Sequence, residues 1–148
     1  MKIRLDFVSN SSSTSFLVSL KGEMSKKNLF KRMGIANVPW LVEAFDDLYN
    51  CVMEADDITI RLKEEEAKAK AKEKVDEEEE EDILYSVLDG YSDKTMEIVR
   101  ELLDKGRVVF EGFFSDYHEG TAVSGFFCNS RVTIHTDDFF FDCNSGGY

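Results

Sequence analysis

Hydrophobic and polar residues alternate near the start of the chain. In residues 2–8, KIRLDFV, the apolar Ile3, Leu5 and Phe7 share one face and the charged residues share the other, which is typical of a half-buried strand. Residues 15–20, SFLVSL, predict a second strand. The serine-rich stretch between them suits a turn, because hydroxyl groups bond readily to nearby backbone. The pattern therefore predicts an N-terminal hairpin.

Apolar residues then recur at helical spacing. Ser25 can cap a short helix over residues 26–33, which Gly34 would end. Pro39 suits the first turn of a longer helix, because a proline there loses no hydrogen bond. The apolar stripe that follows predicts one amphipathic helix over residues 39–62, although ITIRL at its end also alternates as a strand does.

Two further segments lie between this helix and the C-terminal part. Residues 63–82, KEEEAKAKAKEKVDEEEEED, have no apolar face but consist mainly of good helix formers, so we expect an exposed, highly charged helix or a linker. Ser92 can cap an amphipathic helix over residues 92–105, which Gly106 would end.

The C-terminal part is rich in β-branched and aromatic residues. Residues 107–116 and 131–142 predict strands. Runs of phenylalanine at 113–114, 126–127 and 139–141 would place aromatic rings on both faces of such strands. One face should meet the helices. We expect the other to pack against a further layer, the alternative being an exposed partner surface.

These elements predict a single α+β domain over residues 1–148. The N-terminal hairpin and the C-terminal strands would form a small antiparallel sheet. The amphipathic helices at 39–62 and 92–105 would cover one of its faces, and the charged helix at 63–82 would project from the domain or lie along its edge. A length of 148 residues with 43% hydrophobic content is sufficient for a buried core.

Charge narrows the range of partners. Thirty acidic residues against eighteen basic ones give a net charge of −12, which repels phosphate backbones and argues against direct binding of nucleic acid. It favours another protein as the partner, in particular a basic one that normally binds nucleic acid. The densest acidic run is either an interaction surface or a solvated helix face, and it comprises Asp76, Glu77, Glu78, Glu79, Glu80, Glu81 and Asp82.

The cysteines and the hydropathy indicate a compartment. Cys51, Cys128 and Cys143 are an odd and widely spaced set, which is not a disulfide framework. No apolar stretch has the length of a signal peptide or of a membrane span. We therefore expect a cytoplasmic protein with reduced thiols and no membrane association.

One loop is a candidate for ligand binding. Consecutive backbone amides and hydroxyls in a tight turn can hold a phosphate or sulfate, with Lys2 and Arg4 nearby. The stretch lacks the glycines and the lysine of a P-loop. A polar hairpin turn is the favoured explanation of the serines, because local hydrogen bonding alone accounts for them, and phosphorylation is a further alternative. The candidate anion or partner loop comprises Ser9, Asn10, Ser11, Ser12, Ser13, Thr14 and Ser15.

No other motif indicates chemistry. Cys128, His135 and Cys143 are spaced as C-x6-H-x7-C, which matches no zinc pattern. The two histidines belong to no recognisable nucleophile arrangement. We therefore predict no catalytic residues, no metal and no cofactor, and an enzymatic activity is not favoured.

The opening MKIRLDFVSNSSSTSF resembles the start of a group of small bacterial and bacteriophage proteins, in which a basic strand leads into a FVSNSSSSSF stretch. The match covers about a tenth of the chain, and Thr14 stands where a serine is usual. The resemblance implies a prokaryotic or phage origin and an intracellular accessory role, and it transfers no catalytic residue. The matching residues are Lys2, Ile3, Arg4, Phe7, Val8, Ser9, Asn10, Ser11, Ser12, Ser13, Ser15 and Phe16.

Three functions follow as expectations, of which the third is a structural or assembly component that forms oligomers through the aromatic face. The first is a small acidic accessory protein that acts by protein–protein binding. In the specific form of this hypothesis, the protein inhibits a host nucleic-acid or defence enzyme. The alternative is a small enzyme or ligand-sensing domain that uses the serine-rich loop as an anion site.

Overall fold

The structure of this protein, a computed structural model, describes residues 13–71, 83–115 and 132–143. The strand expected at residues 2–8 lies outside these ranges, and with it the N-terminal hairpin. The second half of the charged stretch, residues 72–82, lies outside them as well.

A five-stranded antiparallel sheet forms the middle of the fold. Its central strand is β1 (Ser13–Leu20), which pairs with β3 (Phe110–Ser115) on one side and with β5 (Phe139–Cys143) on the other. β2 (Asp56–Asp57) lies beyond β3 and β4 (Val132–His135) lies beyond β5, so the order is β2-β3-β1-β5-β4. The predicted α+β class with a small antiparallel sheet is confirmed.

The central position of β1 follows from its sequence. Phe16, Leu17 and Val18 are consecutive and have no exposed surface, so both faces of the strand are covered. A strand whose side chains are apolar in both directions is stable only where layers pack on both sides. The strand predicted at residues 15–20 is therefore confirmed, and it begins two residues earlier, at Ser13.

The C-terminal strands are also confirmed, with one difference. The segment 131–142 contains two strands, because a turn at residues 136–138 separates β4 from β5. Thr136 and Phe139 close this turn: the Thr136 amide donates to the Phe139 carbonyl at 2.8 Å, and the Phe139 amide donates to Thr136 Oγ1 at 3.1 Å.

Two predicted helices have the expected boundaries and caps. α1 (Lys26–Met33) begins after Ser25, whose hydroxyl accepts the Asn28 amide at 3.1 Å, and ends at Gly34, whose φ of 82° is left-handed. α6 (Asp93–Asp104) begins after Ser92, whose hydroxyl accepts the Thr95 amide at 3.2 Å. Serine caps and a left-handed glycine satisfy the backbone groups that a helix leaves unpaired at its ends.

The prediction of one helix over residues 39–62 is wrong. The segment contains α2 (Pro39–Ala44), α3 (Asp46–Met53) and the start of α4 (Ile58–Ala71), with β2 between α3 and α4. Residues 58–62 are helical, as expected.

Pairing with the sheet interrupts this segment. Asp56 and Asp57 lie opposite Glu111 and Phe110 of β3, which requires an extended backbone. The Asp57 carboxylate then accepts the Thr59 amide at 2.8 Å, which starts α4. A long-range strand contact thus outweighs a continuous helical stripe.

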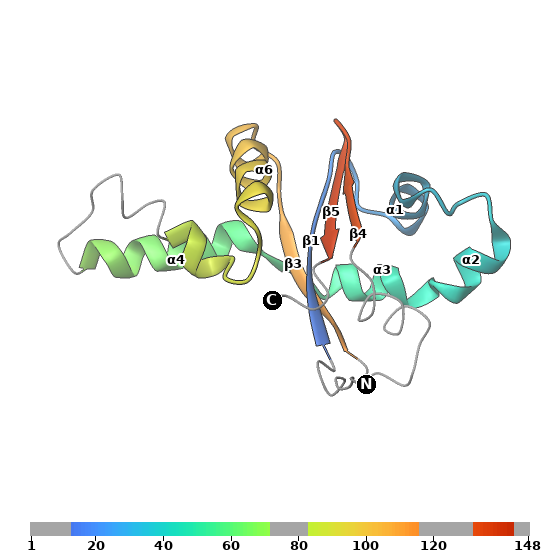
Figure 1. The fold of residues 1–148 in the computed structure, drawn as a ribbon, viewed down its shortest axis with the longest axis horizontal. Coiled ribbons are helices and arrows are strands. Elements are labelled where there is room, and N and C mark those ends of the chain that lie inside the picture. The colour runs from blue at the N-terminus through green and yellow to red at the C-terminus, as the bar shows by residue number, and fades with distance from the viewer. Residues whose placement is uncertain (1–12, 72–82, 116–131, 144–148) are drawn as a thin grey trace, which may run out of the picture.

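Helices cover both faces of the sheet, which contradicts the expectation that one face carries them all. Figure 1 shows α1, α2 and α3 on one side of the strands and α4 and α6 on the other. The alternation of side chains along each strand supplies apolar residues in both directions, so each group of helices has its own core.

The two cores share the sheet. The first core lies under α1 and α3 and comprises Phe16, Val18, Leu29, Phe30, Leu48, Val52, Phe114, Phe139, Phe141 and Cys143. The second core lies under α4 and α6 and comprises Leu17, Ile58, Leu84, Val87, Leu88, Tyr91, Met96, Val99, Leu102, Val109 and Phe140.

The phenylalanine runs divide between the two cores where the structure describes them. Phe139 and Phe141 enter the first core and Phe140 the second, so the expected further layer is present. In β3, Phe114 is buried but Phe113 is exposed. Residues 126–127 lie outside the described ranges.

α4 leaves the body of the fold. Ile58 is its one buried residue, and the helix extends beyond α6 in Figure 1. Residues 63–71 of the charged stretch are therefore an exposed helix. Among the helices of the described ranges, none combines the length and the apolar character needed to cross a bilayer.

Candidate functional site

The serine-rich candidate loop is only partly described. Ser9, Asn10, Ser11 and Ser12 lie outside the described residues, whereas Ser13, Thr14 and Ser15 belong to β1 and lie opposite Ser115, Phe114 and Phe113 of β3. Thr14 is buried. The described part of the stretch is thus a paired strand, and the anion-binding role of the rest stays a prediction.

The acidic candidate run, Asp76 to Asp82, also lies outside the described residues. The chain that leads to it is α4, which is described to Ala71. Lys68 and Glu65 form an exposed ion pair on this helix, with Lys68 Nζ 3.3 Å from Glu65 Oε1. Such a pair contributes little to stability, so α4 is held mainly by its first turns.

Polar residues form a row across the face of the sheet that meets α4 and α6. Glu111 of β3, Leu17 of β1, Asp142 of β5 and Thr133 of β4 lie directly opposite one another in the strand pairing. Two buried carboxylates therefore flank Leu17. A buried carboxylate needs partners, and each of the two has its own.

Asp142 is held by hydroxyl groups. Thr95 Oγ1 donates to its Oδ2 at 3.0 Å, and Thr133 Oγ1 donates to its Oδ1 at 2.7 Å. Ser92 Oγ in turn donates to Thr95 Oγ1 at 3.0 Å. The first turn of α6 is thereby tied to β5, which gives this network a clear structural role.

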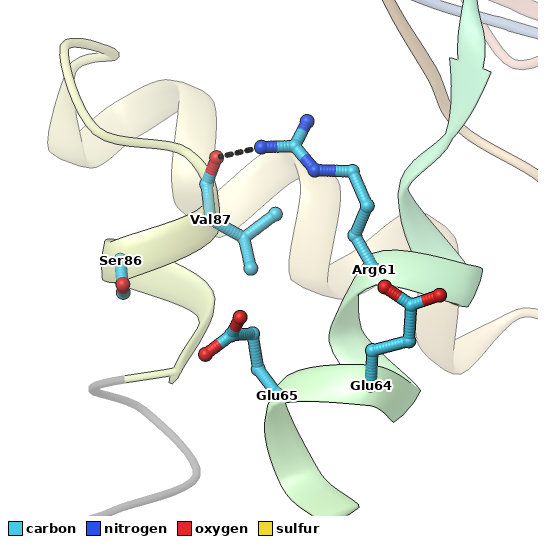
Figure 2. A pocket seen from close by; sticks show the side chains of 5 residues that line it. All are labelled: Arg61, Glu64, Glu65, Ser86 and Val87. Carbon is cyan, nitrogen blue, oxygen red and sulfur yellow. Dashed lines mark hydrogen bonds between the residues drawn. The ribbon is translucent and has the colours of Figure 1, made fainter. Parts of the chain in front are cut away.

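Glu111 is held by Arg61 of α4, which forms a close ion pair with it. The second amino group of Arg61 donates to the Val87 carbonyl at 3.3 Å, as Figure 2 shows. Arg61 thus joins α4, the sheet and the helix at residues 83–87.

A small pocket opens beside this arginine. It has a volume of about 160 Å³ and is lined by Arg61, Glu64, Glu65, Ser86 and Val87 (Figure 2). Small-molecule sites usually measure about 300–1,000 Å³. The arginine is already paired and two carboxylates stand beside it, so the pocket offers no free positive charge to an anionic ligand.

Tyr91 is buried, and both Glu111 and Asp142 are near enough to influence its hydroxyl. Burial, followed by the negative charge of Glu111, raises the pKa of the Tyr91 hydroxyl above its usual range. Ser15 and Glu111 are near enough to influence this pKa, but neither is placed for a well-formed hydrogen bond, and the hydroxyl has no such partner among the described residues. The phenol therefore stays neutral at ordinary pH.

The residues weighed as metal ligands do not converge. His135 lies on the face of the second core, edge-on to Phe140 with ring centroids 5.7 Å apart, whereas Cys143 is buried in the first core on the opposite face. Cys128 lies outside the described residues. Within residues 13–71, 83–115 and 132–143, no three His, Cys, Asp or Glu side chains are arranged to hold a metal ion.

The sequence reasoning missed an exposed apolar helix. α2 has the sequence PWLVEA, yet none of its residues is buried, and Trp40 is 69% exposed. Val42 contacts the first core from the other side of the helix. The sequence contains one signal of this exposure, because Trp40 lies outside the apolar stripe predicted over residues 39–62. We call Pro39, Trp40, Leu41 and Glu43 the α2 surface.

The charges of α1 and those of α2 and α3 have opposite signs. α1 carries four basic residues and no acidic one, whereas α2 and α3 carry three acidic residues and no basic one. The two groups meet where Lys26 of α1 forms an exposed ion pair with Asp46 of α3. Among the described residues, Lys27, Lys31, Glu43 and Asp47 form no ion pair.

Among the described residues, the buried carboxylates Glu111 and Asp142 are paired internally, and α4 and the α2 surface are exposed. Comparison of the chain with protein-family models, curated proteins and solved structures finds no match.

Proposed function

We propose that this protein acts by binding another protein through the acidic segment that follows α4. The observation that carries the proposal is the projection of α4, whose residues 63–71 are not buried and lead directly to the acidic run at 76–82. A helix that contributes so little to either core is free to serve contact with a partner.

Charge supports a basic partner. The chain has a net charge of −12, and an acidic surface attracts basic proteins from a distance and speeds their association. In its specific form, the proposal is that the acidic run occupies the nucleic-acid channel of a host enzyme and thereby inhibits it. The resemblance of the N-terminal stretch to bacterial and bacteriophage proteins agrees with this role.

The polar groups of the described residues favour binding over catalysis. Glu111 is paired with Arg61, and Asp142 accepts bonds from two threonines. Groups that are satisfied internally hold the fold together and are poorly placed to exchange protons with a substrate.

Affinity capture from a bacterial lysate tests the proposal. The tagged full chain should retain a nucleic-acid-binding protein at low salt, and added duplex DNA should release it. Changing Glu77, Glu78 and Glu79 to glutamine should abolish the capture. The matched control, with Glu64, Glu65 and Glu66 of α4 changed to glutamine, removes the same charge and should retain it.

Two results would reject this function. One is capture that both triple variants retain equally. The other is a captured protein that duplex DNA does not displace.

A further inference from the structure

We propose that two copies of this protein pair through their α2 surfaces, with α1 of each copy facing α2 and α3 of the other. The inference goes beyond the proposed function and concerns the opposite end of the molecule, since α2 and α4 lie at the two ends of the long axis in Figure 1.

An apolar anchor is the first requirement of such a pairing. Trp40 is 69% exposed on a helix that has no buried residue. Tryptophan is among the residues that contribute most to protein interfaces, because it buries a large rigid surface on contact. No strand of the sheet takes part in the α2 surface, so contact there is made by side chains.

The basic charges of α1 are complementary to the acidic charges that α2 and α3 would present on a second copy. In a two-fold interface, each surface packs against an identical copy of itself. The basic side of the surface, α1, then faces the acidic side of the partner copy, α2 and α3. α1 supplies the exposed Lys27 and Lys31, and α2 and α3 supply Glu43 and Asp47. The ion pair between Lys26 and Asp46 of the same chain shows that these two flanks adjoin.

The segment that carries the α2 surface is nearly neutral, which limits repulsion between copies there. Residues 21–53 carry five basic and four acidic residues, whereas the whole chain has a net charge of −12. At physiological salt, charges farther apart than about 8 Å are largely screened, so the acidic remainder opposes the pairing only weakly. A pairing through α2 would also leave both α4 helices pointing outward.

The mass of the full chain in solution, measured by sedimentation at physiological salt over a range of concentrations, tests the pairing. We expect a monomer–dimer equilibrium. Trp40 is the only tryptophan of the chain, so its fluorescence should shift to the blue in step with the mass. Trp40→Ala should weaken the dimer about thirtyfold or more, as for the loss of a hot-spot residue.

Phe113→Ala is the matched control, because Phe113 is an aromatic residue of similar exposure, 63%, on another part of the surface. It should leave the dimer unchanged. At concentrations low enough for every chain to be monomeric, the urea midpoints of both variants should stay close to that of the original chain, since neither side chain is buried.

A charge exchange tests the orientation. Lys27→Glu/Lys31→Glu and Glu43→Lys/Asp47→Lys should each be mainly monomeric alone, because like charges then face each other. Mixed in equal amounts, the two variants should form a mixed dimer, since every contact becomes attractive again.

Several outcomes would overturn the pairing. They are a monomeric mass at every concentration, a dimer that persists in Trp40→Ala, and two charge variants that fail to associate when mixed. A blue shift of Trp40 on phosphatidylcholine vesicles without a change of mass would assign the α2 surface to a membrane instead.

Discussion

Gly112 of β3 leaves no space for a side chain between its backbone and the first core. A Cβ atom at this position would lie 2.5 Å from Cζ and 2.8 Å from Cε1 of Phe16, and 3.1 Å from Cβ of Ala55. The Phe16 ring has no room to retreat, because it stacks on Phe114 at 4.5 Å and on Phe141 at 5.8 Å between centroids. The aromatic stack thus requires glycine opposite it.

Gly112→Ala should therefore lower the free energy of unfolding by about 1–3 kcal/mol, the range for overpacking a core. Urea denaturation of the full chain measures the loss. Adding Phe16→Leu to Gly112→Ala should cost less than the sum of the two single changes, because the smaller side chain relieves the clash. Strict additivity would show that the two residues do not compete for space.

Tyr91 makes stability depend on pH at the alkaline end. Its raised pKa means that the folded state keeps the phenol protonated where the unfolded chain already ionises it, above about pH 10. The unfolded state is then favoured, so the free energy of unfolding falls as the pH rises beyond that value. Below it, Tyr91 contributes no pH dependence.

Tyr91→Phe should reduce this alkaline loss and change the stability at pH 7 little, because the hydroxyl is buried without a well-formed hydrogen bond. Urea midpoints at pH 7 and pH 11 measure both effects. Tyr85→Phe serves as the control, since Tyr85 is exposed and should retain the full alkaline loss. An equal loss in both variants would disprove the role of Tyr91.

At the scale of elements, the cap of α6 also belongs to the polar row of the sheet. Ser92 accepts the Thr95 amide and donates to the Thr95 hydroxyl, which donates to Asp142. Ser25 caps α1 in the same way but has no such second connection among the hydrogen bonds of the described residues. The Ser25 cap is therefore local to α1, whereas the Ser92 cap links α6 to the sheet through Thr95 and Asp142.

Ser25→Ala should thus cost about 1 kcal/mol, as for a simple cap, and Ser92→Ala should cost more because Thr95 also loses a hydroxyl partner. Chemical denaturation of both variants gives the comparison. Ser92→Thr keeps the hydroxyl and should recover most of the loss. Equal costs for the two alanine variants would show that the connection to Asp142 adds nothing.

Local signals explain which elements the sequence could predict. α1 and α6 have a serine cap and a periodic apolar face, all within a dozen residues, and both were predicted with their ends. The break of 39–62 depends on Asp56 and Asp57 pairing with residues more than fifty positions away, at Phe110 and Glu111. No local pattern contains that information.

The same limit applies to the exposed surfaces. The charged stretch at residues 63–82 can be recognised from its composition alone. Its first half, residues 63–71, is an exposed helix, as the sequence predicts. Trp40 was not singled out, because α2 reads as the start of a buried amphipathic helix until the kink at Phe45 is known. The position of Trp40 outside the apolar stripe was a hint in the sequence, but the exposure of the whole helix depends on where the neighbouring elements turn, which only the structure shows.

At the scale of the whole molecule, β5 makes the two cores one cooperative unit. Phe140 lies in the second core and Phe141 in the first, on adjacent positions of one strand, and both are fully buried. Loosening either core must disturb the strand that the other core packs against. The two layers of helices should therefore unfold together, although no helix crosses from one face to the other among the described elements.

Phe140→Ala and Phe141→Ala test this coupling. Each should lower the free energy of unfolding by about 3–5 kcal/mol, the usual cost of removing a buried phenylalanine, and each should leave a single transition. Circular dichroism follows both helical layers together, whereas hydrogen exchange of the backbone amides of α1 and α3 follows only the side of the first core. If the cores were independent, Phe140→Ala would shift the first signal and leave the exchange of α1 and α3 unchanged. Coincident shifts of both signals are expected, because β5 cannot lose its packing on one face and keep its register on the other.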